Sequence, residues 1–428
     1  MDTAGVFGQA YCPRLIDPVV RDALVAAGAV LIEGARACGK TMTGLHAASS
    51  YVFVDDAAAQ QMRSVAPQSL LDGASPRLVD EWQLAPELWN LVRRRVDASA
   101  DKGLFILTGS AVPADDVTRH TGAGRLLRLR QRTMTWCEKD SAVSARQGAV
   151  SLAGLFEGER PRGVPDAGMG LDEVLRLILK PGFPGMLSLD ARAAQRLMLG
   201  YLDEVARLDL PRLVDMRRDP AVIGRLLASI ARNVASEVSY ATLTADVRGL
   251  APGITAETIS SYVDALERLF VVERQPVWTP ALRSRARLRT SDKWHLADPA
   301  LAATALAATP ASLLHDLNAA GLLFESAVVH DLRVLGAPLG ADIRHFRDSN
   351  GHEIDAVLAL PDGRWAAVEV KLSGLQVPTG AASLNKAVDQ IDQGLTGPPA
   401  FRLVVTGTGQ AFGLDDGTIT CPLAALRP

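Results

Sequence analysis

Short apolar runs followed by polar or glycine-rich turns recur in the first part of the chain. The run Ala29–Ile32 and the segments Pro76–Trp82 and Gly103–Ser110 have the length and composition of strands buried on both faces of a parallel sheet. Apolar residues then recur at helical spacing in Leu171–Leu179 and Ala191–Leu208. These signals predict an α/β protein with a helical segment after its first sheet.

The next part of the chain, residues 219–305, resembles a winged helix-turn-helix unit. We expect a first helix over Ser239–Asp246 and a second helix whose N-cap is Thr255. Two strands, Phe270–Arg274 and Pro276–Trp278, are expected to lead into the wing.

Composition fits several folded domains. The 428 residues are 48% hydrophobic and 22% charged, which excludes a disordered chain and suffices for two to four domains. The net charge of −3 and the pI near 6.2 argue against a protein that coats nucleic acid by bulk charge, so local basic patches would have to bind it.

The 4 cysteines lie far apart and indicate neither a zinc site nor a disulfide framework. Without a signal peptide or a long apolar run, we expect a cytoplasmic protein that contacts no membrane.

A phosphate-binding loop follows the first apolar run. Residues Gly34 to Thr41 read G-x-x-x-x-G-K-T between a predicted strand and a predicted helix. Backbone N–H groups would turn toward the β-phosphate, Lys40 would reach the β- and γ-oxygens, and Thr41 would bind Mg²⁺. We therefore expect ATP and Mg²⁺ to bind this loop. The expected nucleotide-binding residues are Gly34, Ala35, Arg36, Ala37, Cys38, Gly39, Lys40, Thr41 and Met42.

Two carboxylates stand at the end of the second apolar segment. Asp80 is expected to bind Mg²⁺, and Glu81 is expected to be the general base that activates water. The third strand ends in polar residues, so Ser110 or Thr108 would orient that water or sense the γ-phosphate. Arg125 is a candidate arginine finger offered to a neighbour's γ-phosphate, which predicts a homo-oligomer, either a ring or a dimer. The alternative for Arg125 is a solvated surface position.

With these motifs the chain resembles the bacterial and archaeal AAA-type ATPases that carry the C-terminal domain of unknown function 4143. The likeness covers nearly the whole chain, although Cys38 departs from the usual residue at its place in the loop. It implies an AAA+ core, a helical segment, a winged-helix-like unit and often a nuclease-like tail. The segments that carry the resemblance are Tyr11-x-x-Arg14, Ile32–Arg36, Asp80–Glu81, Leu107–Ser110, Gly124–Arg125, Gly182–Pro184 and Ser261–Glu267.

The tail holds a second set of chemical groups. Glu325 lies on a predicted helix, Asp355 at the mouth of a predicted strand, and Glu369 and Lys371 on one side of the next strand. Carboxylates beside a lysine can hold Mg²⁺ or Mn²⁺ while the lysine stabilises a phosphorane charge. The set resembles the PD-(D/E)XK nuclease core, with Glu325, Asp355 and Glu369 as metal ligands and Lys371 as the catalytic lysine. The alternative is an inherited nuclease fold that only binds or assembles.

A row of arginines precedes the tail, at Arg283, Arg285, Arg287 and Arg289. In an extended chain they would share one side at a spacing of about 6.6 Å, comparable to that of phosphates along one strand. The row therefore predicts contact with DNA or RNA; a protein-docking surface or a solvated edge strand is the alternative.

The predicted architecture is that of a multidomain α/β protein. We expect a P-loop AAA+ ATPase core in 1–157, a helical lid or spacer in 166–218, the winged helix-turn-helix in 219–305 and the PD-(D/E)XK-like α/β tail in 310–428. The first functional hypothesis is an ATP-hydrolysing protein that remodels or processes DNA, with a possible nuclease tail. The second is an ATP-dependent regulatory, defence or toxin–antitoxin component that docks proteins through its winged helix and tail, with an inactive nuclease fold.

Overall fold

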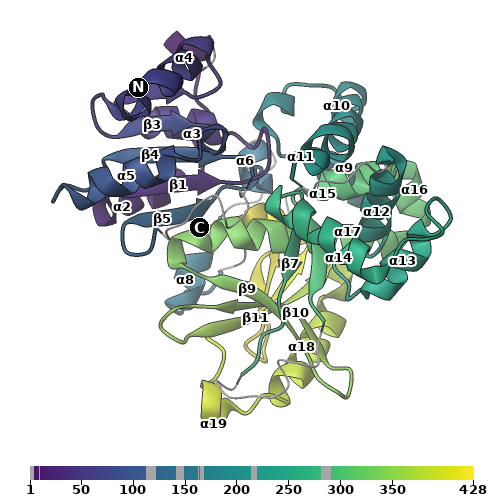
Figure 1. Cartoon of the computed structure of the whole chain (residues 1–428). Coiled ribbons are helices and arrows are strands. Elements are labelled where there is room, and N and C mark those ends of the chain that lie inside the picture. The colour runs from purple at the N-terminus through teal and green to yellow at the C-terminus, as the bar shows by residue number, and fades with distance from the viewer. Residues whose placement is uncertain are drawn as a thin grey trace.

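The computed structural model contains two larger β-sheets, one above the other in Figure 1, with the helices of the middle of the chain to one side of both. Among the residues described, no helix is both long and apolar enough to cross a lipid bilayer. The described residues are 4–8, 10–111, 122–140, 149–161, 163, 168–213, 219–280 and 291–428.

The strands of the N-terminal sheet are β1 (Ala29–Glu33), β2 (Ser50–Phe53), β3 (Arg77–Asp80), β4 (Phe105–Gly109) and β5 (Leu126–Arg130). They are all parallel, in the order β2-β3-β4-β1-β5. The three central strands are almost wholly buried, as the apolar runs predict. Because the strands are parallel, all of their carboxyl ends meet at one edge of the sheet, where ligands bind in such folds.

Helices cover both faces of this sheet. The helices and turns around it are α1 (Ala4–Phe7), α2 (Asp17–Ala26), α3 (Lys40–Ala47), α4 (Ala57–Val65), η1 (Pro67–Leu71), η2 (Trp82–Leu84), α5 (Leu88–Asp97) and α6 (Trp136–Lys139). Side chains of β1 alternate between the two layers: Leu31 packs in the cluster that includes Trp89 of α5, whereas Ile32 packs with Val20 of α2 and Leu45 of α3.

The middle region is mostly helical. Its elements are α9 (Leu171–Leu179), η3 (Pro184–Met186), α10 (Ala191–Glu204), the π-helical turn η4 (Val205–Asp209), α11 (Leu210–Leu213), α12 (Pro220–Arg232), α13 (Tyr240–Val247), α14 (Ala256–Arg268), β7 (Val272–Gln275), β8 (Lys293–Leu296), α15 (Pro299–Ala305) and α16 (Pro310–His315). Ser239 and Thr255 cap α13 and α14, because each side chain accepts a hydrogen bond from a backbone N–H of the first turn.

The expected second strand of the wing is not found at Pro276–Trp278. The backbone N–H of Trp278 donates to the carbonyl of His345 at 2.6 Å, so this segment is attached to the C-terminal sheet instead. The antiparallel partner of β7 is β8, which begins at Lys293. Pairing with a strand so distant in sequence depends on tertiary packing, which a local pattern does not specify.

The C-terminal sheet has the order β13-β14-β12-β11-β10-β9. Strands β9, β10 and β11 form an antiparallel meander, and α18 then crosses over to β12, which is parallel to β11. The elements of this region are α17 (Leu317–Leu335), η6 (Ala337–Leu339), β9 (Asp342–Arg347), β10 (Glu353–Ala359), β11 (Trp365–Lys371), η7 (Gly374–Gln376), α18 (Val377–Asp389), α19 (Gln393–Thr396), β12 (Arg402–Thr406), β13 (Phe412–Gly413), β14 (Ile419–Pro422), η8 (Leu423–Ala425) and β15 (Leu426–Arg427).

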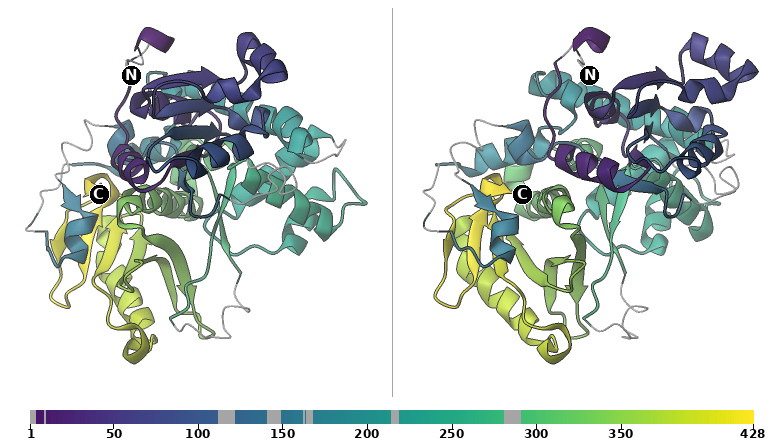
Figure 2. Two further views of the ribbon diagram at one scale, coloured as in Figure 1. Left: turned by 60° about the vertical axis from the view of Figure 1, so that its left-hand side comes forward. Right: turned by 90° about the vertical axis from the view of Figure 1, so that its left-hand side faces the viewer.

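A segment before the middle region also packs on this C-terminal sheet. Strand β6 (Val150–Ser151) pairs with β15, and α8 (Leu152–Phe156) lies beside the C-terminal segment in Figure 2. The ring of Phe156 contacts Phe401, with 4.9 Å between ring centroids. Residues 150–156, which the sequence analysis assigned to the ATPase core, therefore pack against the tail.

Candidate functional site

The loop from Gly34 to Thr41 joins the carboxyl end of β1 to α3. Gly39 has a φ of 102°, a left-handed conformation that side-chain-bearing residues rarely adopt, and this turn starts the helix at Lys40. The Lys40 side chain is buried, and its Nζ donates to the carbonyl of Ala35 at 2.9 Å. Anionic phosphate oxygens would be stronger acceptors for the ammonium than this neutral carbonyl, so Lys40 is poised to exchange partners.

Asp80 ends β3 beside this loop. Its carboxylate accepts hydrogen bonds from the hydroxyl groups of Thr108 and Thr41. Burial raises the pKa of Asp80 to about 6, against the lowering effect of these two hydroxyl groups. A hydroxyl and a carboxylate in direct contact supply oxygen ligands of the kind that Mg²⁺ binds, so the pair fits this ion.

Glu81 leaves β3 through a left-handed backbone conformation, with a φ of 54°. Its carboxylate accepts a hydrogen bond from Ser110 Oγ at 3.1 Å and another from the amide of Gln83. Thr108 therefore contacts Asp80 while Ser110 contacts Glu81, a division that the sequence left open. Gln83 was not predicted, since a glutamine two residues beyond an acidic pair carries no signal of its own.

A cavity of about 340 Å³ opens over the loop. Lys40, Thr41 and Glu81 line one part of it, and Tyr11 and Pro184 line another. The polar groups that would meet phosphates thus share one cavity with apolar and aromatic groups that could contact a base, an arrangement that fits a nucleotide.

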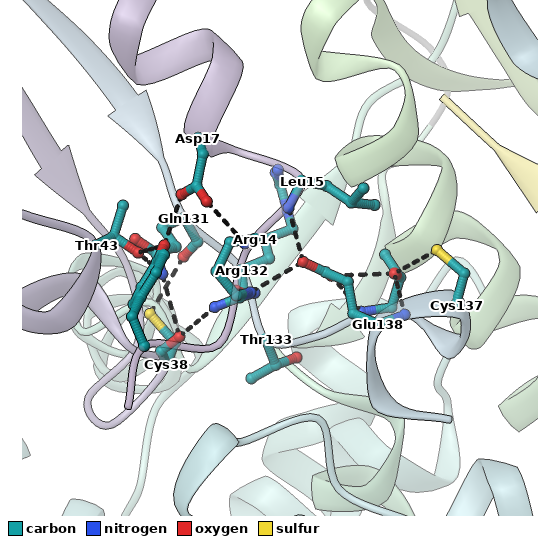
Figure 3. Close-up of polar contacts among 12 residues, drawn as sticks. Arg14, Leu15, Asp17, Cys38, Thr43, Gln131, Arg132, Thr133, Cys137 and Glu138 are labelled. Carbon is teal, nitrogen blue, oxygen red and sulfur yellow. Dashed lines mark hydrogen bonds and ion pairs between the residues drawn. The ribbon is translucent and has the colours of Figure 1, made fainter. Parts of the chain in front are cut away.

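A buried network of hydrogen bonds holds the carbonyl of Cys38 in the loop (Figure 3). The guanidinium of Arg14 donates to the carbonyl of Cys38 at 2.9 Å and pairs with Glu138 at 2.9 Å. The amide of Gln131 donates to the same carbonyl at 3.3 Å and to Thr43 Oγ1 at 3.1 Å. Gln131 and Glu138 were missed because they lie 93 and 124 positions from their partners.

Arg36 connects the loop to the middle region. Its guanidinium pairs with Asp209 of η4 at 2.9 Å, although Arg36 is half exposed. Both residues line a second cavity of about 520 Å³, which also reaches Glu81 and is closed partly by Tyr201 of α10. The loop is therefore joined to the middle region of the same chain by this ion pair.

The proposed arginine finger lies at the opposite edge of the sheet. The carbonyl of Arg125 accepts from the N–H of Ala29 at the amino end of β1, about 16 Å from the loop by strand rise. Its guanidinium pairs with Asp97 at 2.5 Å. Arg125 therefore does not serve the site of its own chain, and a role at a neighbour's site stays a prediction. The proposed nucleic-acid residues Arg283, Arg285, Arg287 and Arg289 lie outside the described residues.

The predicted tail residues meet between the middle of α17 and the strands β10 and β11. Asp355 on β10 accepts from the backbone N–H of Val370 at 2.7 Å, and Lys371 Nζ pairs with Glu369 Oε1 at 2.7 Å. Burial, followed by the charge of Asp355, raises the pKa of Glu325 to about 8 and that of Glu369 to about 7. The structure thus brings these carboxylates together, and their burial disfavours the charged form of each.

A residue that sequence reasoning missed, Lys293, enters this cluster from β8. Its Nζ lies 2.7 Å from Glu325, 2.6 Å from Glu353 and 3.8 Å from Asp355. Within the described part of the chain, no group of three or more histidine, cysteine or acidic residues has the arrangement of a metal site. The tail donor set therefore does not fit the Mg²⁺ or Mn²⁺ ion expected from the sequence, because an ammonium group already lies among its carboxylates.

Asp80→Asn is expected to stabilise the protein without nucleotide. The pKa of Asp80 is about 6 in the folded state and 3.8 ordinarily, so ionisation of Asp80 destabilises the folded state. This destabilisation begins as the pH rises past about 3.8 and is complete above about 6. Removing it should raise the free energy of unfolding by at most about 3 kcal/mol. Denaturation of parent and variant below and above pH 6 measures the free energy of unfolding, and Asp22→Asn, at an exposed position, is the control. Destabilisation by Asp80→Asn above pH 6 would contradict the raised pKa of Asp80.

Three family models match separate parts of the chain. Residues 26–138 match the family described as AAA domain, residues 171–312 match the domain of unknown function DUF8612, and residues 320–426 match the domain of unknown function DUF4143. The second match covers the helices α9 to α16, which the sequence analysis divided between two units.

Relatives and solved structures with partial likeness were also found. The uncharacterized proteins Rv2008c of Mycobacterium tuberculosis and Mb2031c of Mycobacterium bovis are each 25% identical over 410 residues, which covers 94% of this chain and 82% of theirs. The Walker-type ATPase PABY2304 of Pyrococcus abyssi aligns with a TM-score of 0.40 and 15% identity over 68% of this chain and 94% of its own. Drosophila ORC bound to DNA aligns with a TM-score of 0.23 and 13% identity, over 65% and 89%.

The loop, the acidic strand end and the two outer family matches agree with one another. The phosphate-loop motif and the acidic pair fall within the AAA-domain match, and the sheet that carries Asp355 and Glu369 falls within the DUF4143 match. The chain therefore contains an AAA domain followed by a C-terminal DUF4143 domain.

Proposed function

We propose that this chain hydrolyses ATP in the cavity over its phosphate loop. The observation that carries this proposal is the contact of Thr41 with Asp80 beside Glu81, which Ser110 holds. Thr41 and Asp80 would hold Mg²⁺, whose charge would polarise the γ-phosphate. The buried ammonium of Lys40 would bind the phosphate oxygens.

Glu81 would take the proton from the attacking water. Its carboxylate is fixed by hydrogen bonds from Ser110 and Gln83, so one oxygen is oriented before ATP arrives. The γ-phosphate and its water would lie between Lys40 and Glu81, because both residues line the same cavity. Arg36 belongs to the loop that would hold the phosphates, so its ion pair with Asp209 would carry a change of the loop on cleavage into the middle region.

The proposed target of this cycle is DNA. Three helices, α12 to α14, followed by the hairpin β7–β8, have the order of a winged helix. The arginine row 283–289 falls in the sequence between these two strands, where a wing would lie. We further propose a cytoplasmic homo-oligomer in which Arg125, at the edge of the sheet remote from its own loop, serves a neighbouring subunit.

A second candidate function, protein docking, is favoured by the charge of α14. In a winged helix this helix would read the DNA major groove. Its exposed residues include Glu257 and Asp264, which would repel phosphate. Asp264 and Glu267 both form ion pairs with Arg274 of the same region. A protein with a basic surface is therefore the alternative partner.

ATP turnover of the full chain distinguishes the two functions. Hydrolysis is expected to need Mg²⁺ and to be stimulated by single-stranded, duplex or four-way DNA. Indifference to every nucleic acid would contradict the proposed DNA function while leaving the ATPase intact. Absence of any Mg²⁺-dependent turnover, with ATP shown to bind, would contradict the ATPase itself.

The arginine row is expected to contact phosphates. Replacing Arg285 and Arg287 by Gln should weaken binding to all DNA sequences alike and lower the slope of log affinity against log salt by about 2, because each phosphate contact releases about one counterion. Arg192→Gln with Arg196→Gln, on the exposed face of α10, removes the same charge and should leave the slope unchanged. Equal effects of the two double variants would assign the row to solvation.

A further inference from the structure

Lys293 begins β8 in the middle region, but its side chain lies in the tail. The ammonium nitrogen is 2.7 Å from Glu325 Oε1 of α17, 2.6 Å from Glu353 Oε1 of β10 and 3.8 Å from Asp355 Oδ1 of β10. Only 4% of the side chain is exposed. A lysine is almost never buried to this extent unless carboxylates surround it, as they do here.

The hairpin that carries Lys293 is fastened to the tail on both sides. The amide of Gln275, the partner of Lys293 across the hairpin, donates to the carbonyls of Asp355 at 2.8 Å and Arg344 at 3.0 Å. Two residues along β8, buried His295 shares a hydrogen bond with Ser326 of α17 at 3.0 Å. The position of the ammonium is therefore set by backbone and side-chain contacts, and not by its carboxylate partners alone.

A divalent ion bound to these carboxylate oxygens would have to share them with the ammonium. Mg²⁺ binds oxygen at about 2.0–2.1 Å and demands a nearly ideal shell. An ion at that distance from Glu325 Oε1 or Glu353 Oε1 would compete with Lys293 for lone pairs already used at hydrogen-bond length. Two positive centres this close, with little water between them, would also repel each other strongly.

The cluster is nevertheless open to ions from the other side. Glu325 and Asp355 line a groove of about 1000 Å³, together with Lys371 and the exposed side chains of Leu317 and Leu375. Access to solvent is therefore present, and Lys293 reaches the carboxylates from behind the groove.

We propose that Lys293 is the resident cation of the tail's acidic site, so that the unmodified chain binds no divalent ion there and loss of this ammonium creates a divalent-metal site. The ligands of the new site would be Glu325 and Asp355, which Lys293 contacts and which line the groove. This inference is independent of whether the phosphate loop hydrolyses ATP.

Mn²⁺ binding to the full chain tests the proposal, measured by electron paramagnetic resonance in an Asp80→Asn background that removes the ion site of the loop. The parent and Lys293→Arg, which keeps the charge, should show no saturable site. Lys293→Met should show one, and Mn²⁺ should raise its thermal midpoint. Adding Glu325→Gln to Lys293→Met should abolish the site.

A second variant covers the case in which Lys293→Met does not fold. Lys293→Met with Glu353→Gln removes one charge of each sign and keeps both proposed ligands, so it should fold and bind one Mn²⁺. A folded double variant without this site would overturn the proposal. A parent protein with a saturable site that Asp355→Asn abolishes would overturn it as well.

Discussion

Glu81→Gln is expected to leave ATP binding intact and to slow hydrolysis by about 10²–10⁴, the usual contribution of a general base. The amide cannot take a proton from water, yet it can still accept the hydrogen bond that Ser110 donates to Glu81 at 3.1 Å. Asp80 and Thr41, which would hold the ion, are unchanged. Single-turnover hydrolysis and equilibrium nucleotide binding, measured on the same preparation, separate the two effects.

Lys40→Ala provides the contrasting variant. Its loss removes the buried charge that would meet the phosphates, so binding itself should fail and turnover should fall with it. Parental turnover by Glu81→Gln would show that another group is the base. Normal ATP affinity in Lys40→Ala would show that the nucleotide binds elsewhere.

Glu273→Gln is expected to destabilise the protein by about 3–5 kcal/mol, the cost of breaking a buried ion pair. The Glu273 carboxylate accepts from Arg130 at 3.2 Å, from Arg132 at 3.0 Å and from Arg333 at 3.0 Å. Arg130 and Arg132 extend from the nucleotide-site sheet, Glu273 is on β7 and Arg333 is on α17. The substitution would leave three guanidinium groups at this junction without their carboxylate.

The pH dependence follows from the same contacts. Burial alone would raise the pKa of Glu273, but the three guanidinium groups outweigh burial and hold it well below 4.5. The stabilisation is therefore fully present above about pH 4.5 and is lost as the pH falls through the lower folded-state value.

Urea denaturation of parent and variant at neutral and acidic pH measures both effects. Glu157→Gln is the matched control, because Glu157 pairs with Arg364 at the surface, where an ion pair contributes at most about 1 kcal/mol. A Glu273→Gln protein as stable as the control variant would mean that the arginines find water or other acceptors.

Much of the nucleotide site could be predicted from sequence because its signals are local. The strand run, the glycine turn and Lys40 are contiguous, and the caps Ser239 and Thr255 act within one helical turn. The predictions that failed or remained open concern partners far apart in sequence. Val277 lies two positions after the end of β7, yet it bridges to β9 because the neighbouring sheet offers it a free edge.

The sequence by itself determined the phosphate loop, the placement of Asp80 and Glu81 at a strand end, and the E-x-K pattern at Glu369, since each depends on residues a few positions apart. Only the tertiary structure decided that Thr108 contacts Asp80 and that Lys293 contacts the tail's carboxylates. Lys293 lies 32 positions from Glu325. A contact at that separation depends on how the hairpin packs on α17, and the free energy of burying an ammonium among carboxylates exists only once that packing has formed.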